Sequence, residues 1–192
     1  VLVGEVARFR KGLEMIPEIP GAPDREYPFE FTIKEANRAG GYLEDFNRRI
    51  YEFESTKDAS GGAVVRFVSP QLNEGLRLIK EFRFPREGFV GSLTLTLANE
   101  SKGSFHFEEQ GFGPGICWGG GFGQATGSRY ATPPAAVWLS GGQPFYKEES
   151  GLRVGDLQEF AAGADWAGLT DQYFFAALIP VEQAARSEEH TS

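Results

Sequence analysis

The glycine-rich segment at residues 121–127 is the first part of the chain whose residue types suggest a chemical role. It reads Gly-Phe-Gly-Gln-Ala-Thr-Gly and superficially resembles a loop that wraps a dinucleotide pyrophosphate. Such a loop needs a strand before it, a helix after it and an acidic residue about 20 positions further on. Thr132, Pro133 and Pro134 follow soon afterwards and block a helix. We therefore predict an ordered glycine-rich loop and no nucleotide site.

The histidines and the single cysteine do not form a recognisable site. His106 lies between Phe105 and Phe107, and alternate residues of a strand point to opposite faces. If both phenylalanines face a core, His106 faces solvent. The other histidine, His190, lies in the C-terminal tail, so no metal pair is expected. Cys117 is expected to be a small hydrophobic residue of a loop rather than a nucleophile, because no histidine is placed beside it.

Two acidic pairs are the remaining candidates for acid–base chemistry. They are Glu108-Glu109 and Glu148-Glu149. A glycosidase needs two carboxyl groups that converge on one bond, whereas neighbours on a strand diverge. Solvated strand ends are the better interpretation. We predict no catalytic, cofactor-binding or metal-ligating residue, and we do not expect an enzyme.

Composition limits the class of protein further. The chain has 192 residues, enough for one domain with a sizeable core, and its single cysteine excludes an internal disulfide. Its net charge of −8 argues against nucleic-acid binding and against electrostatic attachment to anionic lipid. The sequence shows no signal peptide or run of about 20 apolar residues. Because it starts at Val1, we expect a fragment of a longer protein.

The last seven residues differ in character from everything before them. Arg-Ser-Glu-Glu-His-Thr-Ser at residues 186–192 is what the string AGATCGGAAGAGCACACGTCT encodes, which is a common short-read sequencing adapter. We hypothesise that this heptad is a non-native tail and that the native sequence of this domain occupies residues 1–185. A longer native gene in which the heptad continues unchanged would disprove the hypothesis.

Strands are the elements expected to position any functional residues of the chain. The 17 Phe, 6 Tyr, 25 Gly and 11 Pro are typical of strands joined by turns. Alternation predicts strands at residues 29–33, 63–68, 135–139, 143–147 and 156–161, with at most one helical turn near residues 43–46. Residues 76–84 and 89–97 form the clearest hairpin, with apolar residues on one face and polar residues on the other. A third strand follows through Phe105 and Phe107.

Two segments complete this predicted arrangement. Residues 110–134 are rich in glycine and predict a long ordered loop over one end of the fold. Residues 173–179 are apolar at both parities, which predicts a central strand covered on both faces. Just before it, Trp166 to Gly168 give a bulky anchor and then a backbone position without a Cβ. On these residues alone, a core strand and its turn are the expected role.

The order of these motifs resembles the large periplasmic domain of bacterial YidC membrane protein insertases. The most specific part is a Trp-Ala-Gly followed by Tyr-Phe and an apolar strand that ends in proline. The resemblance covers most of residues 1–185, is weaker before residue 60, and departs from the family in the glycine-rich insertion at residues 119–127. The residues that carry it, all expected to be structural, are Gly113, Pro114, Gly115, Pro133, Trp166, Gly168, Tyr173, Phe174 and Pro180.

The resemblance implies a fold, a location and partners. The fold would be an all-β, two-sheet antiparallel β-super-sandwich similar to galactose mutarotase. The domain would face the periplasm from the bacterial inner membrane, between one transmembrane helix and a five-helix membrane core. That core performs insertion in the family, so this domain would be accessory and no insertase residue carries over. Its partners would be the Sec translocon and nascent inner-membrane proteins, and no cofactor is implied.

Two other functions fit the same fold class. A non-catalytic carbohydrate- or peptide-binding module would use aromatic residues such as Trp118 and Phe122, which stack on sugar rings. Saturable sugar binding lost in Trp118→Ala would favour it. A mutarotase-like epimerase is the weaker alternative, because such enzymes resemble one another in using histidines with a glutamate, and only His106 is available outside the tail.

Overall fold

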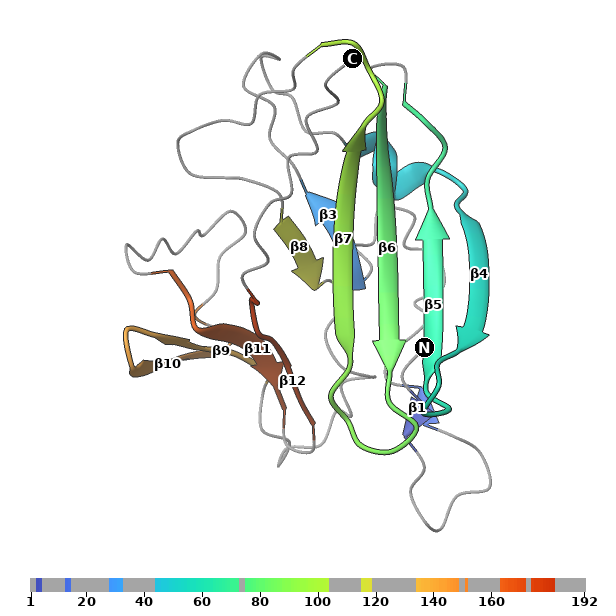
Figure 1. Cartoon of the computed structure of the whole chain (residues 1–192). Helices are drawn as coiled ribbons and strands as arrows, with labels where there is room; N and C mark the ends of the chain where they lie inside the picture. The colour runs from blue at the N-terminus through green and yellow to red at the C-terminus, as the bar shows by residue number, and fades with distance from the viewer. Residues whose placement is uncertain are drawn as a thin grey trace. The chain divides into compact units, whose positions relative to one another are not determined.

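The computed structural model describes residues 3–4, 13–14, 28–32, 44–72, 75–103, 115–118, 134–148, 151, 163–171 and 174–181 (Figure 1). The chain divides into two compact units, Glu26–Gly119 and the combination of Val1–Arg25 with Gly120–Ser192. Each unit is described by itself. The described residues form antiparallel strands and one short 3-10 helix, so the prediction of an all-β antiparallel fold is confirmed.

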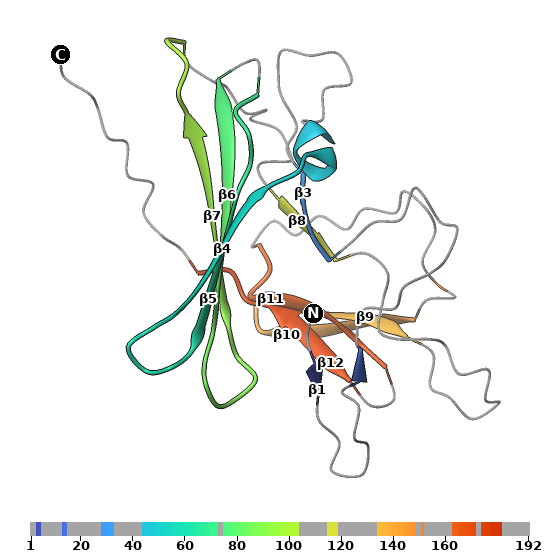
Figure 2. The ribbon, with the colours of Figure 1, turned by 90° about the vertical axis from the view of Figure 1, so that its right-hand side faces the viewer.

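The larger sheet of the 26–119 unit is an antiparallel meander. In order across the sheet, its strands are β4 (Glu52–Lys57), β5 (Ala63–Val68), β6 (Leu76–Phe84) and β7 (Ser92–Asn99). Figures 1 and 2 show these four strands side by side. The strand predicted at residues 63–68 and the hairpin that follows it are confirmed, because their alternation and turns are local signals.

The two faces of this sheet differ as the alternation predicts. On one face, Leu78 lies opposite Leu97, and Phe82 lies opposite Leu93. Leu78 is fully buried there. On the other face, Glu81 lies opposite Arg66. Period-two alternation therefore gives one apolar and one charged face.

A smaller ribbon and the 3-10 helix cover part of the apolar face. β3 (Pro28–Thr32) pairs with β8 (Gly115–Trp118), and η1 (Glu44–Arg48) is the helix. Phe31 of β3 and Phe46 of η1 meet edge to face, with ring centroids 5.9 Å apart. The buried core of this unit is Phe31, Phe46, Leu72, Leu76 and Leu78.

The strand β8 corrects the prediction that residues 110–134 are a loop throughout. Four of those residues form a strand whose partner, β3, lies far back in the sequence. A short apolar run between glycines gives no local signal of a distant partner. Cys117 therefore lies on a strand and not on a loop.

The second unit contains its own four-stranded antiparallel sheet. Its strands, in order, are β10 (Gln143–Glu148), β9 (Ala135–Ser140), β11 (Trp166–Thr170) and β12 (Phe175–Leu178). The hairpin of β9 and β10 turns at Gly141 and Gly142, whose φ angles are 57° and 73°. Consecutive positive φ values are what a tight hairpin turn requires, and this predicted hairpin is confirmed.

The centre of this sheet is not where the sequence predicted it. β11 pairs with β9 on one side and β12 on the other, whereas β12 pairs within the described residues with β11 alone. Phe175 and Ile179 are 58% and 65% exposed. The prediction of a central strand buried on both faces at residues 173–179 was therefore wrong. Trp166 to Gly168, read as an anchor before a turn, form the inner strand instead.

The remaining predictions lie partly outside the described residues. β1 (Val3–Gly4) and β2 (Leu13–Glu14) form a small ribbon. The strands predicted around Phe105 and at residues 156–161 lie outside, and the extent of one domain over residues 1–185 stays a prediction. None of the helices in the described part of the chain has the length and apolar character needed to cross a bilayer.

Candidate functional site

The residues expected to carry the family motif fall on both units. Trp166 and Gly168 lie on β11, Phe174 precedes β12, and Pro180 follows it. Gly115 begins β8 in the other unit. The motif residues outside the described part of the chain are Gly113, Pro114, Pro133 and Tyr173.

Gly168 occupies a position where a side chain does not fit. It pairs with Val137 on one side and Ala177 on the other, so the backbone is enclosed by both neighbouring strands. A Cβ built at Gly168 collides with the backbone oxygen of Ala176 and lies 3.0 Å from the Cα of Ala177. The requirement for glycine is therefore steric, and it comes from backbone atoms that have no rotamer to change.

Trp166 packs on Phe175 of the neighbouring strand. Trp166, Gly168 and Thr170 share one face of β11, and Phe175 lies opposite Thr170 on β12. The Trp166 and Phe175 rings meet at an 89° interplanar angle with centroids 5.7 Å apart. Edge-to-face aromatic pairs of this kind add to the stability of the sheet.

The turn between β11 and β12 fixes the backbone of Phe174. Its N–H donates to Asp171 Oδ1 at 2.7 Å, and its carbonyl oxygen accepts from Asp171 N at 2.9 Å. The Thr170 hydroxyl donates to the same carbonyl oxygen at 3.2 Å. These bonds fix the turn between β11 and β12.

Lys80 is a cation on the otherwise apolar face of the larger sheet. Lys80 lies between Leu78 and Phe82, where the alternation of β6 predicts an apolar residue. A lysine at that position is a signal in the sequence that the sequence analysis missed. Its Nζ donates to the carbonyl oxygen of Phe29 at 2.8 Å and lies 5.7 Å from the centroid of the Tyr51 ring. Burial lowers the pKa of Lys80, and the nearby Glu30 carboxylate opposes that shift.

The carbonyl that Lys80 holds belongs to an unusual backbone position. Phe29 has a φ of 64° at a register shift in β3, and a bulky residue rarely adopts that conformation. Its ring packs edge to face on Phe82, with centroids 5.2 Å apart. Lys80 and Phe82 together hold the strained residue in place. The amine is thus engaged with a backbone acceptor and stabilises the strand β3 over the sheet.

Tyr51 contributes its ring but leaves its hydroxyl without a partner. The Tyr51 hydroxyl oxygen is buried and makes no hydrogen bond. Burial raises the pKa of Tyr51 to about 12. The cluster of Tyr51, Lys80 and Phe29 is therefore arranged for packing, with one polar atom that costs free energy.

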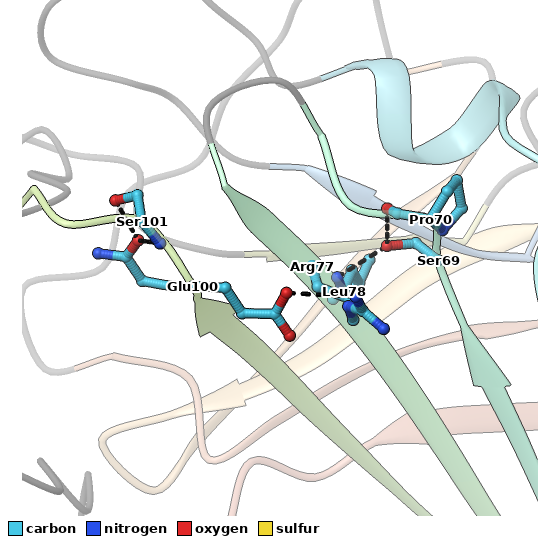
Figure 3. Close-up of polar contacts among 7 residues, drawn as sticks. Ser69, Pro70, Arg77, Leu78, Glu100 and Ser101 are labelled. Carbon is cyan, nitrogen blue, oxygen red and sulfur yellow. Dashed lines mark hydrogen bonds and ion pairs between the residues drawn. The ribbon is translucent and has the colours of Figure 1, made fainter.

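Ser69 completes the hydrogen bonding of β6 where β5 ends (Figure 3). Its N–H donates to the carbonyl oxygen of Leu78, and its hydroxyl accepts from the N–H of Leu78, both at 2.9 Å. The hydroxyl also donates to the carbonyl oxygen of Pro70 at 2.9 Å. On the opposite face of the same strand, Arg77 pairs with Glu100 at 3.2 Å.

The charged face of the larger sheet carries an open depression. Its lining includes Glu54, Arg66, Glu81 and Arg83. Arg66 lies between Glu54 and Glu81 in register, and Arg83 pairs with Glu81 at 2.7 Å. Alternating charges of this kind are typical of a sheet face that is exposed to solvent. Within the described ranges, no three of the residues that commonly bind metal ions are grouped together.

The sequence-level candidates for chemistry are mostly outside the described residues. His106, Glu108, Glu109, Glu149 and the segment 121–127 lie there. Glu148 is exposed at the end of β10, as predicted. Trp118 lies on β8, whereas Phe122 is among the residues that are not described.

Comparison with known proteins identifies the family. A family model described as the YidC periplasmic domain matches residues 21–192. The chain belongs to the YidC periplasmic domain family. The resemblance stated from the sequence is thereby confirmed, and the chain is a periplasmic domain of the YidC type. No curated protein and no solved structure gives a significant match.

Proposed function

We propose that this YidC-type periplasmic domain is an accessory part of a membrane protein insertase, without catalytic chemistry of its own. It would lie on the periplasmic face of the bacterial inner membrane and assist the insertion and folding of inner-membrane proteins, alone or with the Sec translocon. The family match over residues 21–192 carries this proposal.

The roles of the motif residues support an architectural domain. Gly168 leaves room for the backbone of β12, Trp166 packs on Phe175, and Phe174 closes a turn. These residues build a sheet rather than present groups to a substrate. Residues that only maintain a rigid fold suit a domain that positions partners near an insertion machinery.

The test replaces this domain in the full-length insertase with a flexible linker. We expect insertion of a reporter membrane protein to persist at a reduced rate and co-purification with the Sec translocon to fall. The exposed-site variant Ile50→Ser in the intact protein serves as the control and should change neither. Unchanged insertion together with unchanged Sec co-purification would contradict the proposed accessory role.

A further inference from the structure

We propose that the tip of the β6–β7 hairpin, residues 88–91, is a membrane-contact site that inserts Phe89 and Val90 into the lipid interface. Phe89 is fully exposed at 104% and Val90 is 81% exposed. The tip lies beyond the last β6–β7 pair, Arg83 with Ser92. Figures 1 and 2 show it at the same end of the sheet as the β4–β5 turn.

Two glycines with separate structural requirements bracket these apolar residues. Gly88 has a φ of 103°, a conformation that residues with a Cβ rarely adopt. At Gly91, a Cβ would lie 2.7 Å from the carbonyl oxygen of Arg83 and 3.2 Å from the Phe84 ring. The chain therefore turns at one glycine and returns close to β6 at the other. Phe89 and Val90 are presented between them by a defined backbone.

The charge pattern favours lipid as the occupant. No charged residue occurs from Gly88 to Asn99, and the two residues before this run, Arg86 and Glu87, have opposite charges. The tip therefore has no net charge that an oppositely charged protein partner could recognise. A convex apolar tip beside a cation with a flexible stem suits the lipid interface, where aromatic rings are buried and arginines extend to the headgroups.

The family adds the required proximity. The chain belongs to the YidC periplasmic domain family, and this inference rests on the proposed function in placing a bilayer near the folded domain. The contact goes beyond the proposed insertase role, since lipid binding by the tip does not depend on Sec or on client proteins. Because the net charge is −8, the contact is expected to be apolar rather than driven by anionic lipid.

The experiment measures partition of the 192-residue chain into phosphatidylcholine vesicles. A background carrying Cys117→Ser and Val90→Cys receives an environment-sensitive fluorophore at residue 90. We expect the emission to rise and shift to the blue with added lipid, and shallow nitroxide lipids to quench it. Phe89→Ser in this background should lower the partition coefficient about tenfold, since a phenylalanine ring is withdrawn from the interface. Adding phosphatidylglycerol should not tighten the binding.

A matched control lies at the opposite end of the same sheet. Ile50 is 94% exposed and precedes β4, whose far end is next to the tip. Ile50→Ser removes a comparable exposed apolar residue and should leave partition unchanged. Both variants should keep the melting midpoint of the parent, because both side chains are exposed.

Three outcomes would overturn the proposal. One is no change in emission at millimolar lipid. Another is an equal loss of partition in Ile50→Ser, which would indicate general surface hydrophobicity. The third is a dimer in sedimentation experiments that dissociates in Phe89→Ser, which would make a second copy of the chain the occupant of the tip.

Discussion

At the scale of single residues, this domain depends on positions where one particular side chain, or none, is tolerated. Gly168 is enclosed by the strands on both sides, and a Cβ there would meet the backbone of β12. Lys80 interrupts an apolar face in order to hold a strained phenylalanine. Both positions are explained by contacts with backbone atoms, which adjust less readily than side chains do.

Gly168→Ala should destabilise the chain by about 1–3 kcal/mol, the usual range for overpacking, because its methyl group meets backbone atoms of β12. Urea denaturation measures the change. Gly103→Ala is the control, since among the described residues only the Ser101 hydroxyl comes within 4.0 Å of a Cβ there. It should alter the free energy of unfolding by less than about 0.5 kcal/mol. Equal effects of the two substitutions would contradict the steric account.

Tyr51→Phe should stabilise the domain by about 1 kcal/mol at neutral pH, because it removes a buried hydroxyl without a partner. Chemical denaturation of both proteins provides the measurement. A loss of stability would show that the hydroxyl makes a favourable interaction.

The same substitution should also change the alkaline pH dependence. The pKa of Tyr51 is raised in the folded state to about 12, from an ordinary value of about 10. Titration of Tyr51 therefore leaves the unfolding free energy unchanged below pH 10 and lowers it as the pH rises from 10 towards 12. The difference in unfolding free energy between Tyr51→Phe and the parent should grow in that window. Lys80 is present in both proteins, so its own titration largely cancels. A constant difference would contradict the assignment.

At the scale of elements, local strands were predictable and distant pairings were not. β5, β6 and β7 follow each other through short turns, so alternation and turn residues located them. β8 was missed because its partner β3 is far away in sequence. The centre of the other sheet was misplaced for the same reason, since β11 takes its inner position from β9. The sequence singled out Gly168 as a position without a Cβ, but its steric role depends on the backbone of β12, which only the structure shows.

Ser69→Ala tests how the end of β5 supports β6. The substitution leaves the buried N–H of Leu78 without its acceptor, which should cost about 1–3 kcal/mol. Urea denaturation and faster hydrogen exchange at the Leu78 amide are the readouts. Ser60→Ala, which removes an exposed hydroxyl bonded to Asp58, is the control and should change stability by less than about 0.5 kcal/mol. Unchanged exchange at Leu78 would contradict this role.

At the scale of the whole molecule, the chain divides into two compact units. The buried cluster of Phe31, Phe46, Leu72, Leu76 and Leu78 lies entirely within Glu26–Gly119. A unit with its own sheet and core meets the basic condition for independent folding.

An isolated fragment of residues 26–119 should therefore retain a β-rich circular dichroism spectrum and melt cooperatively. Leu78→Ala in that fragment should lower its stability by about 2–5 kcal/mol, because Leu78 is fully buried. A fragment that is unfolded in isolation would favour the single domain over residues 1–185 that the sequence predicted.

The pairing of β3 with β8 also has a consequence for biogenesis. During synthesis, β3 emerges before the whole of the β4–β7 meander. Its partner emerges only after that meander is complete, so closing this long loop is a late event. Until then, the leucines of β6 lack the layer that shields them in the folded unit.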